Sequence, residues 1–540
     1  MLMVVGALVA RRQYLRPLWE PRGADWGMWF ASAAWPFHDV QWPPVRWPLW
    51  GFSAAFLDQL SPAPLHVDAM LLSMLCTGLA GAATFAVVRP LAGITAAVCG
   101  VALLLLHPMT LEIGGWLGGY SMLAMTGPLV AAALASATRG RTASWWVAGA
   151  AFAVCLAVQE KGIVNAIGMV PAFVVAIALQ FRARGGREAA RSVWRVGAPV
   201  AVLALAYFLF PGPMASLDAQ ATLQNEGHAA PPPAMVMIDK SKPMEQPASP
   251  TATTGWIFGR QMGPMTILGL AEKGLAPPTK ETSAVHAAKL RFVLAESFPG
   301  ADKRVVGIFV AAGLLAFLAA FAQGVRARRW DAMVAVVALV GVVASAFPSL
   351  HSDFNLRFLV APGWALPALL ASGLGAAGRW VVAGTSAARW TGPAAAALGT
   401  LLMVGPYRKG STWSWDDCPI FAKAEPNEHL AGQIWLDLEK GWPGVPIDVQ
   451  SPFSGGALAV EGREGRYLSG LDLSIEPATP SHWLILPAPM GRETVGAPAA
   501  TLGLLGDDGR AVNLGARRIA AVWPGGGSSA IVLLTPDAPP

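Results

Sequence analysis

Charged residues are scarce in this chain of 540 amino acids: Asp, Glu, Lys and Arg make up 13% of it, whereas hydrophobic residues make up 54%. A soluble domain carries about 25% charged residues, so a soluble single-domain protein is excluded. The net charge of +6 comes without any dense basic block, which excludes a nucleic-acid-binding protein. High apolar content with low net charge also excludes intrinsic disorder. A protein that crosses a membrane several times remains.

Cysteine is rare as well. Cys76, Cys99 and Cys155 lie in apolar runs and Cys418 lies in a polar region, with no CxxC pair and no Cys/His cluster. The spacing supports neither a zinc site nor a disulfide framework, so we expect inert buried thiols. Tryptophan, in contrast, is abundant, with 22 residues, and this residue collects at membrane–water interfaces.

Long apolar runs dominate the first three quarters of the chain, and a membrane-spanning helix needs about 20 mostly apolar residues. Ten such runs follow one another, at 67–88, 92–107, 117–137, 143–159, 162–181, 196–213, 305–324, 332–348, 358–377 and 390–406. The shorter run 1–10 lacks the features of a signal peptide, and we interpret it as the end of a further helix. The sequence therefore predicts an α-helical integral membrane protein with about eleven transmembrane helices.

Basic residues alternate between successive connections, which predicts the orientation. One set of short loops contains only Lys161 and Arg357, and the other set contains thirteen arginines. The thirteen are Arg89, Arg139, Arg141, Arg182, Arg184, Arg187, Arg191, Arg195, Arg326, Arg328, Arg329, Arg379 and Arg389. The positive-inside rule places the arginine-rich set in the cytoplasm. The loop 11–66 is an exception, because it falls outside and yet carries five arginines.

Two domains follow from this topology. Residues 1–406 form a multi-span membrane domain with large outer loops at 11–66 and 214–304, and residues 407–540 form an extracytoplasmic C-terminal domain. In the second domain the spacing of 427–440 predicts an amphipathic helix. Apolar runs at 447–449, 482–486 and 530–534, separated by Gly and Pro, predict strands. We therefore expect a small α/β domain on the outer side.

Ionisable residues in or beside membrane-spanning segments are energetically costly, so each one is a candidate for a functional role. In this topology they gather on the outer face, in four separate connections: Asp25, His38 and Asp39; His107 and Glu112; Glu160 and Lys161; His351, Asp353 and Arg357. Their convergence predicts a site at the outer membrane surface. Each also has an ordinary interpretation: Asp25 as a helix cap, Glu160 with Lys161 as a charge pair that ends a span, and Arg357 as a snorkelling anchor.

Four segments also occur in the order of known family motifs. Residues 45–49 (VRWPL) with 65–68 (LHVD), residues 107–112 (HPMTLE) with 115–123 (GWLGGYSML), residues 159–163 (QEKGI) and residues 356–362 (LRFLVAP) form the series. They resemble the "YRPL … YHLVN", "HPVHTEAVAWVSGRADLL", "SKEQGI" and "SRYLYLPS" motifs of GT-C membrane glycosyltransferases. The nearest branches are the bacterial protein-O-mannosyltransferase-like and TMTC-like ones, and the resemblance covers roughly residues 20–375.

The resemblance implies a cell-envelope enzyme of the bacterial inner membrane. It would transfer a sugar from a polyprenyl-phosphate-linked donor to a protein, lipid or glycan acceptor on the extracytoplasmic side, with Asp25 as the base. The chain departs from the family where a second acid is replaced by Trp26 and a lysine by Gln159. The Arg and Asp of the family's "GRAD" are Tyr120 and Met122 here, so the chain resembles a divergent member.

The chemistry of transfer agrees with this assignment. An acceptor hydroxyl needs a carboxylate to take its proton, and the leaving phosphate needs cations. Asp25 suits the first role with Glu160 orienting it, and Arg357, Lys161 and Arg46 suit the second, since arginine binds phosphate with two donors. The other predicted substrate-binding residues are His107, Glu112, His38, Asp39 and Tyr120. No cofactor is required; a divalent ion on Asp25, Asp39 or Glu160 stays an alternative that no metal motif demands.

Two other functions stay open from the sequence. A transporter or flippase of a lipid-linked or polar substrate would place broken helices and charges at the bilayer midplane, whereas the runs here are clean between their ends. A non-catalytic membrane scaffold with an outer binding domain is favoured by the missing second acid and lysine. The glycosyltransferase interpretation requires Asp25, Glu160 and Arg357 to line one outer cavity.

Overall fold

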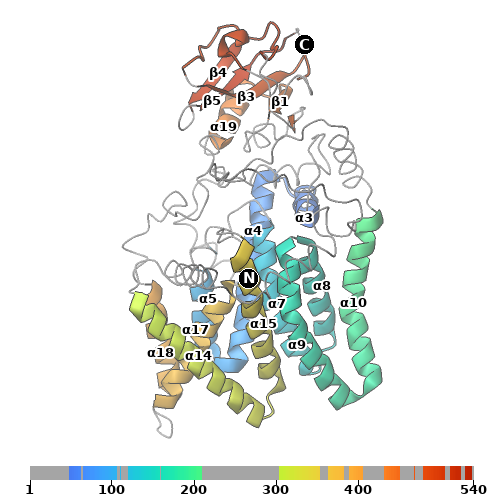
Figure 1. Cartoon of the computed structure of the whole chain (residues 1–540), viewed down its shortest axis with the longest axis vertical. Helices are drawn as coiled ribbons and strands as arrows, with labels where there is room; N and C mark the ends of the chain where they lie inside the picture. Colours follow the sequence, from blue (N-terminus) through green and yellow to red (C-terminus); the bar gives the residue numbers. More distant parts are fainter. Residues whose placement is uncertain are drawn as a thin grey trace.

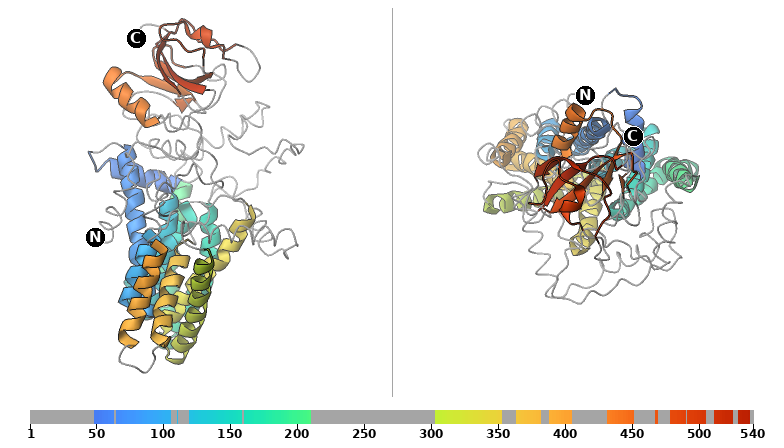
Figure 2. Two further views of the ribbon diagram at one scale, coloured as in Figure 1. Left: turned by 90° about the vertical axis from the view of Figure 1, so that its left-hand side faces the viewer. Right: turned by 90° about the horizontal axis from the view of Figure 1, so that it is seen from above.

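The structure is a computed structural model with a helical bundle at one end and a small sheet domain at the other (Figure 1). It describes residues 48–62, 65–105, 110, 119–158, 160–209, 303–352, 363–381, 388–404, 431–450, 467–468, 478–489, 491–504, 511–524 and 529–537. The sheet domain lies beyond the end of the bundle at which the first long helix begins (Figures 1 and 2).

Each of the ten apolar runs from 67–88 onward coincides with a helix. The helices are α4 (Leu65–Ala92), α5 (Ile94–Leu105), α7 (Tyr120–Thr138), α8 (Ala143–Val158), α9 (Glu160–Arg184), α10 (Gly186–Leu209), α14 (Lys303–Arg326), α15 (Trp330–Ser352), α17 (Ala365–Val381) and α18 (Ala388–Val404). The helical nature of the predicted membrane domain is thus confirmed. The run 1–10 lies outside the described residues.

Three helices of the described part are long and apolar enough to cross a membrane, over Asp68–Ala92, Tyr120–Thr138 and Asn165–Arg184. Four further apolar helical segments are shorter: Ile94–Leu105, Ala143–Val158, Trp330–Val343 and Ala365–Gly375. The predicted total of about eleven transmembrane helices stays a prediction.

Short turns make consecutive helices antiparallel. One residue, Gly93, separates α4 from α5, and Gly185 separates α9 from α10. Both have positive φ (92° and 84°) and donate their N–H to the carbonyl four residues earlier, Gly93 to Arg89 at 2.9 Å. A glycine in this left-handed conformation ends a helix without the strain that a side chain would add.

The bundle packs through small residues. A Cβ on Gly149 of α8 would lie 2.7 Å from the carbonyl oxygen of Val196 in α10, and a Cβ on Gly341 of α15 would overlap the carbonyl of Gly168 in α9. Glycine lets helix backbones approach this closely, as membrane helices commonly do. Large apolar side chains point outward instead, among them Leu315 and Leu401, as expected of a surface that faces lipid.

A helix that the sequence analysis did not predict, α3 (Pro48–Asp58), lies within the segment assigned to the loop 11–66. Proline at the first helical position starts it favourably. Trp50 and Ala54, one turn apart, are fully buried, and α3 packs against α4 and α8. With 11 residues it is too short to span a membrane, and tertiary packing explains why it forms.

The sheet domain consists of α19 (Ala431–Gly441), β1 (Ile447–Gln450), β2 (Tyr467–Leu468), β3 (Trp483–Pro489), the short helix η6 (Ala499–Leu502), β4 (Ile519–Pro524) and β5 (Ser529–Leu534). The strand order is β2-β1-β3-β5-β4, parallel among the first three and antiparallel from β3 onward. The predicted helix and three strands are confirmed. Strands β2 and β4 were not predicted, since β2 has two residues and β4 carries two alanines.

Both faces of this sheet are covered. On one face, Ile434 and Leu438 of α19 are buried together with Ile447, Val449 and Ile485. The other face buries Leu484, Leu486, Val532 and Leu534 together with Ala499 and Leu502 of η6. Neighbouring strand residues thus alternate between two cores, which is the period-two pattern of a strand.

Candidate functional site

The starts of several helices meet at the end of the bundle that faces the sheet domain (Figure 1). A Cβ on Gly162 in the first turn of α9 would overlap the carbonyl oxygen of Cys155 in α8 and lie 3.3 Å from Cδ1 of Leu123 in α7. The Sγ of Cys155 in turn lies 3.2 Å from the carbonyl oxygen of Gly162. We call the first turns of α4, α7, α9 and α17 with the last turn of α8 the motif end.

The start of α17 belongs to the same group. Trp364, the residue before α17, is buried, and its indole Nε1 would lie 2.5 Å from a Cβ on Gly127 of α7. Only a glycine in α7 leaves room for this indole. Residues 356–362, which resemble the fourth family motif, precede Trp364 by two positions in the sequence.

Three of the predicted site residues lie at the motif end. Glu160 is the first residue of α9 and Lys161 follows it; their side chains lie outside the described part of the structure. Tyr120 is the first residue of α7 and is buried. The other predicted residues, Asp25, His38, Asp39, Arg46, His107, Glu112 and Arg357, lie outside the described residues, so their place in the fold stays a prediction.

One acidic residue at the motif end received no role from the sequence. Asp68, in the first turn of α4, is 1% exposed and is the one buried Asp, Glu, Lys or Arg side chain among the described residues of the bundle. The positive end of the helix dipole favours a carboxylate in the first turn. The sequence feature that could have identified Asp68 is an acidic residue at the start of an otherwise apolar run. Such residues in membrane proteins indicate a functional role.

Further polar groups are buried at the start of α7. Ser121 is 1% exposed, and its hydroxyl makes no hydrogen bond among the described residues. Gly119 precedes the helix without any side-chain cap. A buried hydroxyl without a partner costs about 1–3 kcal/mol, so the motif end contains polar groups that packing alone does not require. Asn165 of α9 adds a buried amide one turn beyond Lys161.

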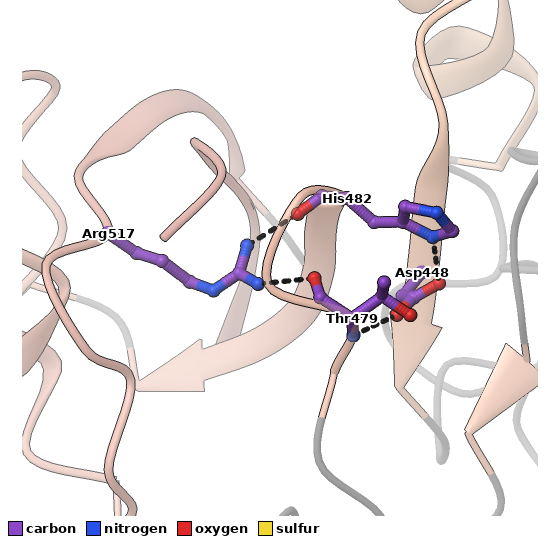
Figure 3. A network of polar contacts seen from close by, with 4 residues as sticks. All are labelled: Asp448, Thr479, His482 and Arg517. Carbon is purple, nitrogen blue, oxygen red and sulfur yellow. Dashed lines mark hydrogen bonds and ion pairs between the residues drawn. The ribbon is translucent and has the colours of Figure 1, made fainter. Parts of the chain in front are cut away.

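The sheet domain holds a separate polar network (Figure 3). Asp448 at β1 is fully buried; one carboxylate oxygen lies 2.8 Å from Nδ1 of His482, and the other accepts the N–H of Thr479 at 2.7 Å. Arg517, 3% exposed, donates to the carbonyls of His482 (2.7 Å), Thr479 (2.9 Å) and Thr535 (2.9 Å). Burial lowers the pKa of Arg517, while Asp537 and Asp448 act to raise it.

This network serves the fold rather than catalysis. Its members bind backbone groups of the turn at 479–482 and so tie that turn to β1 and to the strand end at Thr535. No group of three or more His, Cys, Asp or Glu side chains that could hold a metal ion occurs among the described residues.

Comparison with known proteins gives matches among solved structures alone. No protein-family model matches the sequence, and no curated protein matches it at a significant level. Among solved structures, the chain is similar to the apo oligosaccharyltransferase of Archaeoglobus fulgidus (TM-score 0.49, 13% identity, 90% of this chain and 69% of the other). It is also similar to the archaeal oligosaccharyltransferase AglB from the same organism with an inhibitory peptide and a dolichol-phosphate (0.46, 13%, 89% and 68%).

A third similar structure is ArnT from Cupriavidus metallidurans bound to undecaprenyl phosphate, with a TM-score of 0.38, 14% identity, and 98% of this chain and 97% of the other covered.

Proposed function

We propose that this protein is a membrane glycosyltransferase of GT-C type that transfers a sugar from a polyprenyl-phosphate-linked donor to an extracytoplasmic acceptor. The observation that carries the proposal is the motif end. The first three motifs reach the starts of α4, α7 and α9, and the fourth motif precedes α17. These four helix starts lie at one end of the bundle. Gly127 of α7 and Trp364, more than 200 residues apart, are therefore neighbours near the end of the bundle where a lipid-linked donor would present its head group.

The buried polar groups support chemistry at this end. Asp68, Ser121 and Asn165 are removed from water, and hydrogen bonds and charges act more strongly in such an environment. In the proposed mechanism Asp25 takes the proton of the acceptor hydroxyl, and Glu160, at the start of α9, orients the base. Arg357 and Lys161 neutralise the leaving phosphate, as Arg46 does from the first loop.

The donor lipid proposed here is of the same class as dolichol-phosphate and undecaprenyl phosphate, which are bound in two of the similar structures. The family motifs and the shared helix ends support this choice. A divalent ion at the acidic residues of the first loop and α9 stays an additional hypothesis.

A transporter is the alternative that the structure tests most directly. The described helices are continuous, and Asp68, their buried ionisable residue, lies in the first turn of its helix. A substrate path would instead need broken helices and polar groups at the midplane. The arrangement within the described residues therefore favours a reaction at one membrane surface.

Glycan analysis in cells tests the proposal. A deletion strain is complemented with the wild-type gene, with Asp25→Asn, or with Glu439→Gln, a matched loss of charge at an exposed position of α19. We expect the deletion and Asp25→Asn to lose the same envelope glycan in mass spectra and Glu439→Gln to restore it. If the deletion strain loses no glycan, the proposed function is wrong. If Asp25→Asn restores the glycan fully, the function can stand but Asp25 is not the base.

A further inference from the structure

Seven arginines gather at the end of the bundle opposite the sheet domain (Figure 1). We call them the arginine patch: Arg139 and Arg141 between α7 and α8, Arg182 and Arg184 in the last turn of α9, and Arg187, Arg191 and Arg195 on α10. The two turns touch, because a Cβ on Gly140 would collide with the guanidinium of Arg184. Positions 187, 191 and 195, four residues apart, share one face of α10.

The patch is only partly neutralised. Arg139 pairs with Asp331 at 3.8 Å, and Glu188 pairs with Arg191 and, at 3.9 Å, with Arg195. Seven guanidinium groups against two carboxylates leave a formal excess of five positive charges. Four of the arginines are exposed and have no acidic partner within the described part of the chain, namely Arg141, Arg182, Arg184 and Arg187.

Large apolar side chains are exposed beside these charges. Trp194 of α10 is 67% exposed and Trp146, in the first turn of α8, is 44% exposed. The two helices are in direct contact at this level, since Gly149 meets the backbone of Val196. Tryptophan at the foot of a bundle marks the membrane interface. A soluble anion or a nucleic acid would use the arginines and leave these indoles uncovered, whereas a phospholipid uses both.

We propose that the arginine patch binds the head group of an anionic phospholipid, with its phosphate held by the unpaired guanidinium groups and its acyl chains lying along Trp146 and Trp194. Simple orientation in the membrane requires only positive charge, which lysine supplies equally well. Arginine adds a fork of donors that fits a phosphate with two hydrogen bonds. Basic pockets between membrane helices on the cytoplasmic side recognise lipid head groups by this means. The proposal is independent of sugar transfer at the motif end.

Lipid binding by the purified full-length protein tests the proposal. The protein in uncharged detergent is titrated with phosphatidylglycerol or phosphatidylcholine and observed by native mass spectrometry. The test variant is Arg182→Gln with Arg187→Gln, and the control is Arg326→Gln with Arg328→Gln, two exposed arginines at the turn between α14 and α15. Both variants lose two charges from the same end of the bundle.

We expect phosphatidylglycerol to bind the wild-type protein more tightly than phosphatidylcholine, and the test variant to lose about tenfold to thirtyfold in affinity while the control loses less than threefold. The pair Arg182→Lys with Arg187→Lys, which keeps the charge and loses the forks, should fall between. Equal binding of the two lipids would overturn the proposal. So would equal losses in both glutamine variants, since binding would then follow net charge rather than this site. Unchanged elution and near-ultraviolet circular dichroism establish that each variant is folded.

Discussion

Gly162 offers the sharpest test of the motif end, because its lack of a side chain holds three helices together. A Cβ at this position would overlap the carbonyl oxygen of Cys155 and press on Leu123 at 3.3 Å. Backbone atoms cannot rotate out of the way, so Gly162→Ala must move the start of α9 away from the carbonyl oxygen of Cys155, which the new Cβ would otherwise overlap. Overpacking of this kind costs about 1–3 kcal/mol.

The functional cost should exceed the cost in stability. Glu160 and Lys161 are the residues that immediately precede Gly162, so a displaced helix start displaces both. A misplacement of about 1 Å in an active site lowers a rate about 10²-fold. On the proposed function, we therefore expect Gly162→Ala to insert into the membrane and yet to transfer sugar about a hundredfold more slowly than the wild-type protein.

Two glycines in other helices serve as controls. Gly197 in α10 has no atom within 4 Å of an added Cβ, so Gly197→Ala should keep full activity and gain up to about 1 kcal/mol from helix propensity. Gly341 in α15 faces the backbone of Gly168 as tightly as Gly162 faces Cys155, so Gly341→Ala should lower thermal stability in the same way. The assay compares sugar transfer with the melting temperature for the three variants. If Gly162→Ala loses no more activity than Gly341→Ala at equal loss of stability, the motif end has no special role in the reaction.

Two of the four further predictions rest on the described structure, at Asp68 and Arg517, and two rest on the sequence. Asp68→Asn keeps the shape of a buried side chain and removes its charge, so sugar transfer should drop at least tenfold while membrane insertion stays normal. Full activity of this variant would make Asp68 purely structural. Arg357→Lys should retain part of the activity and Arg357→Ala none; wild-type rates in both would contradict its role as a phosphate ligand. Alkaline phosphatase fused after Pro540 should be active in the periplasm, and a fluorescent cytoplasmic reporter at the same position should be dark; the reverse pattern would refute the outer location of the sheet domain. Arg517→Met leaves three part-buried carbonyls without their charged donor, so hydrogen exchange in the sheet domain should accelerate by an amount that corresponds to about 3 kcal/mol. Arg518→Met, at an exposed position, should change it little.

The helices of the bundle were predictable because each consists largely of a continuous apolar run. In a membrane, a single apolar segment can satisfy its own backbone hydrogen bonds only as a helix. All ten runs overlap helices, but the connection between the runs 162–181 and 196–213 was predicted too long. Arg182 and Arg184 end α9, only Gly185 separates it from α10, and the arginines at 187, 191 and 195 are helical. Helix α3 escaped prediction, because its 11 residues are stabilised by contact with α4 and α8 rather than by any periodicity strong enough to stand out.

The candidate site was predictable only in outline. The motif order indicated which segments belong together, and the structure places Tyr120 and the backbone of Glu160 at one end. Asp68 was present in a quoted motif but received no role, since nothing in a linear pattern shows that a carboxylate one turn into a span is buried against neighbouring helices. The predicted residues of the first loop and Arg357 lie outside the described residues, so their part of the site stays a prediction.

The sequence by itself determined the membrane class, the positions of the helices and the sides on which charge accumulates, because hydropathy and positive charge act through the solvent that surrounds each segment. Only the tertiary structure decided which segments touch. Gly162 meets Cys155 and Leu123, Trp364 fills the space left by Gly127, and the turn at Gly140 meets Arg184 at the end of α9. Each of these contacts requires a glycine, with no side chain, where two segments cross. Because the interior is closely packed, such a glycine determines which residues far apart in the sequence can touch.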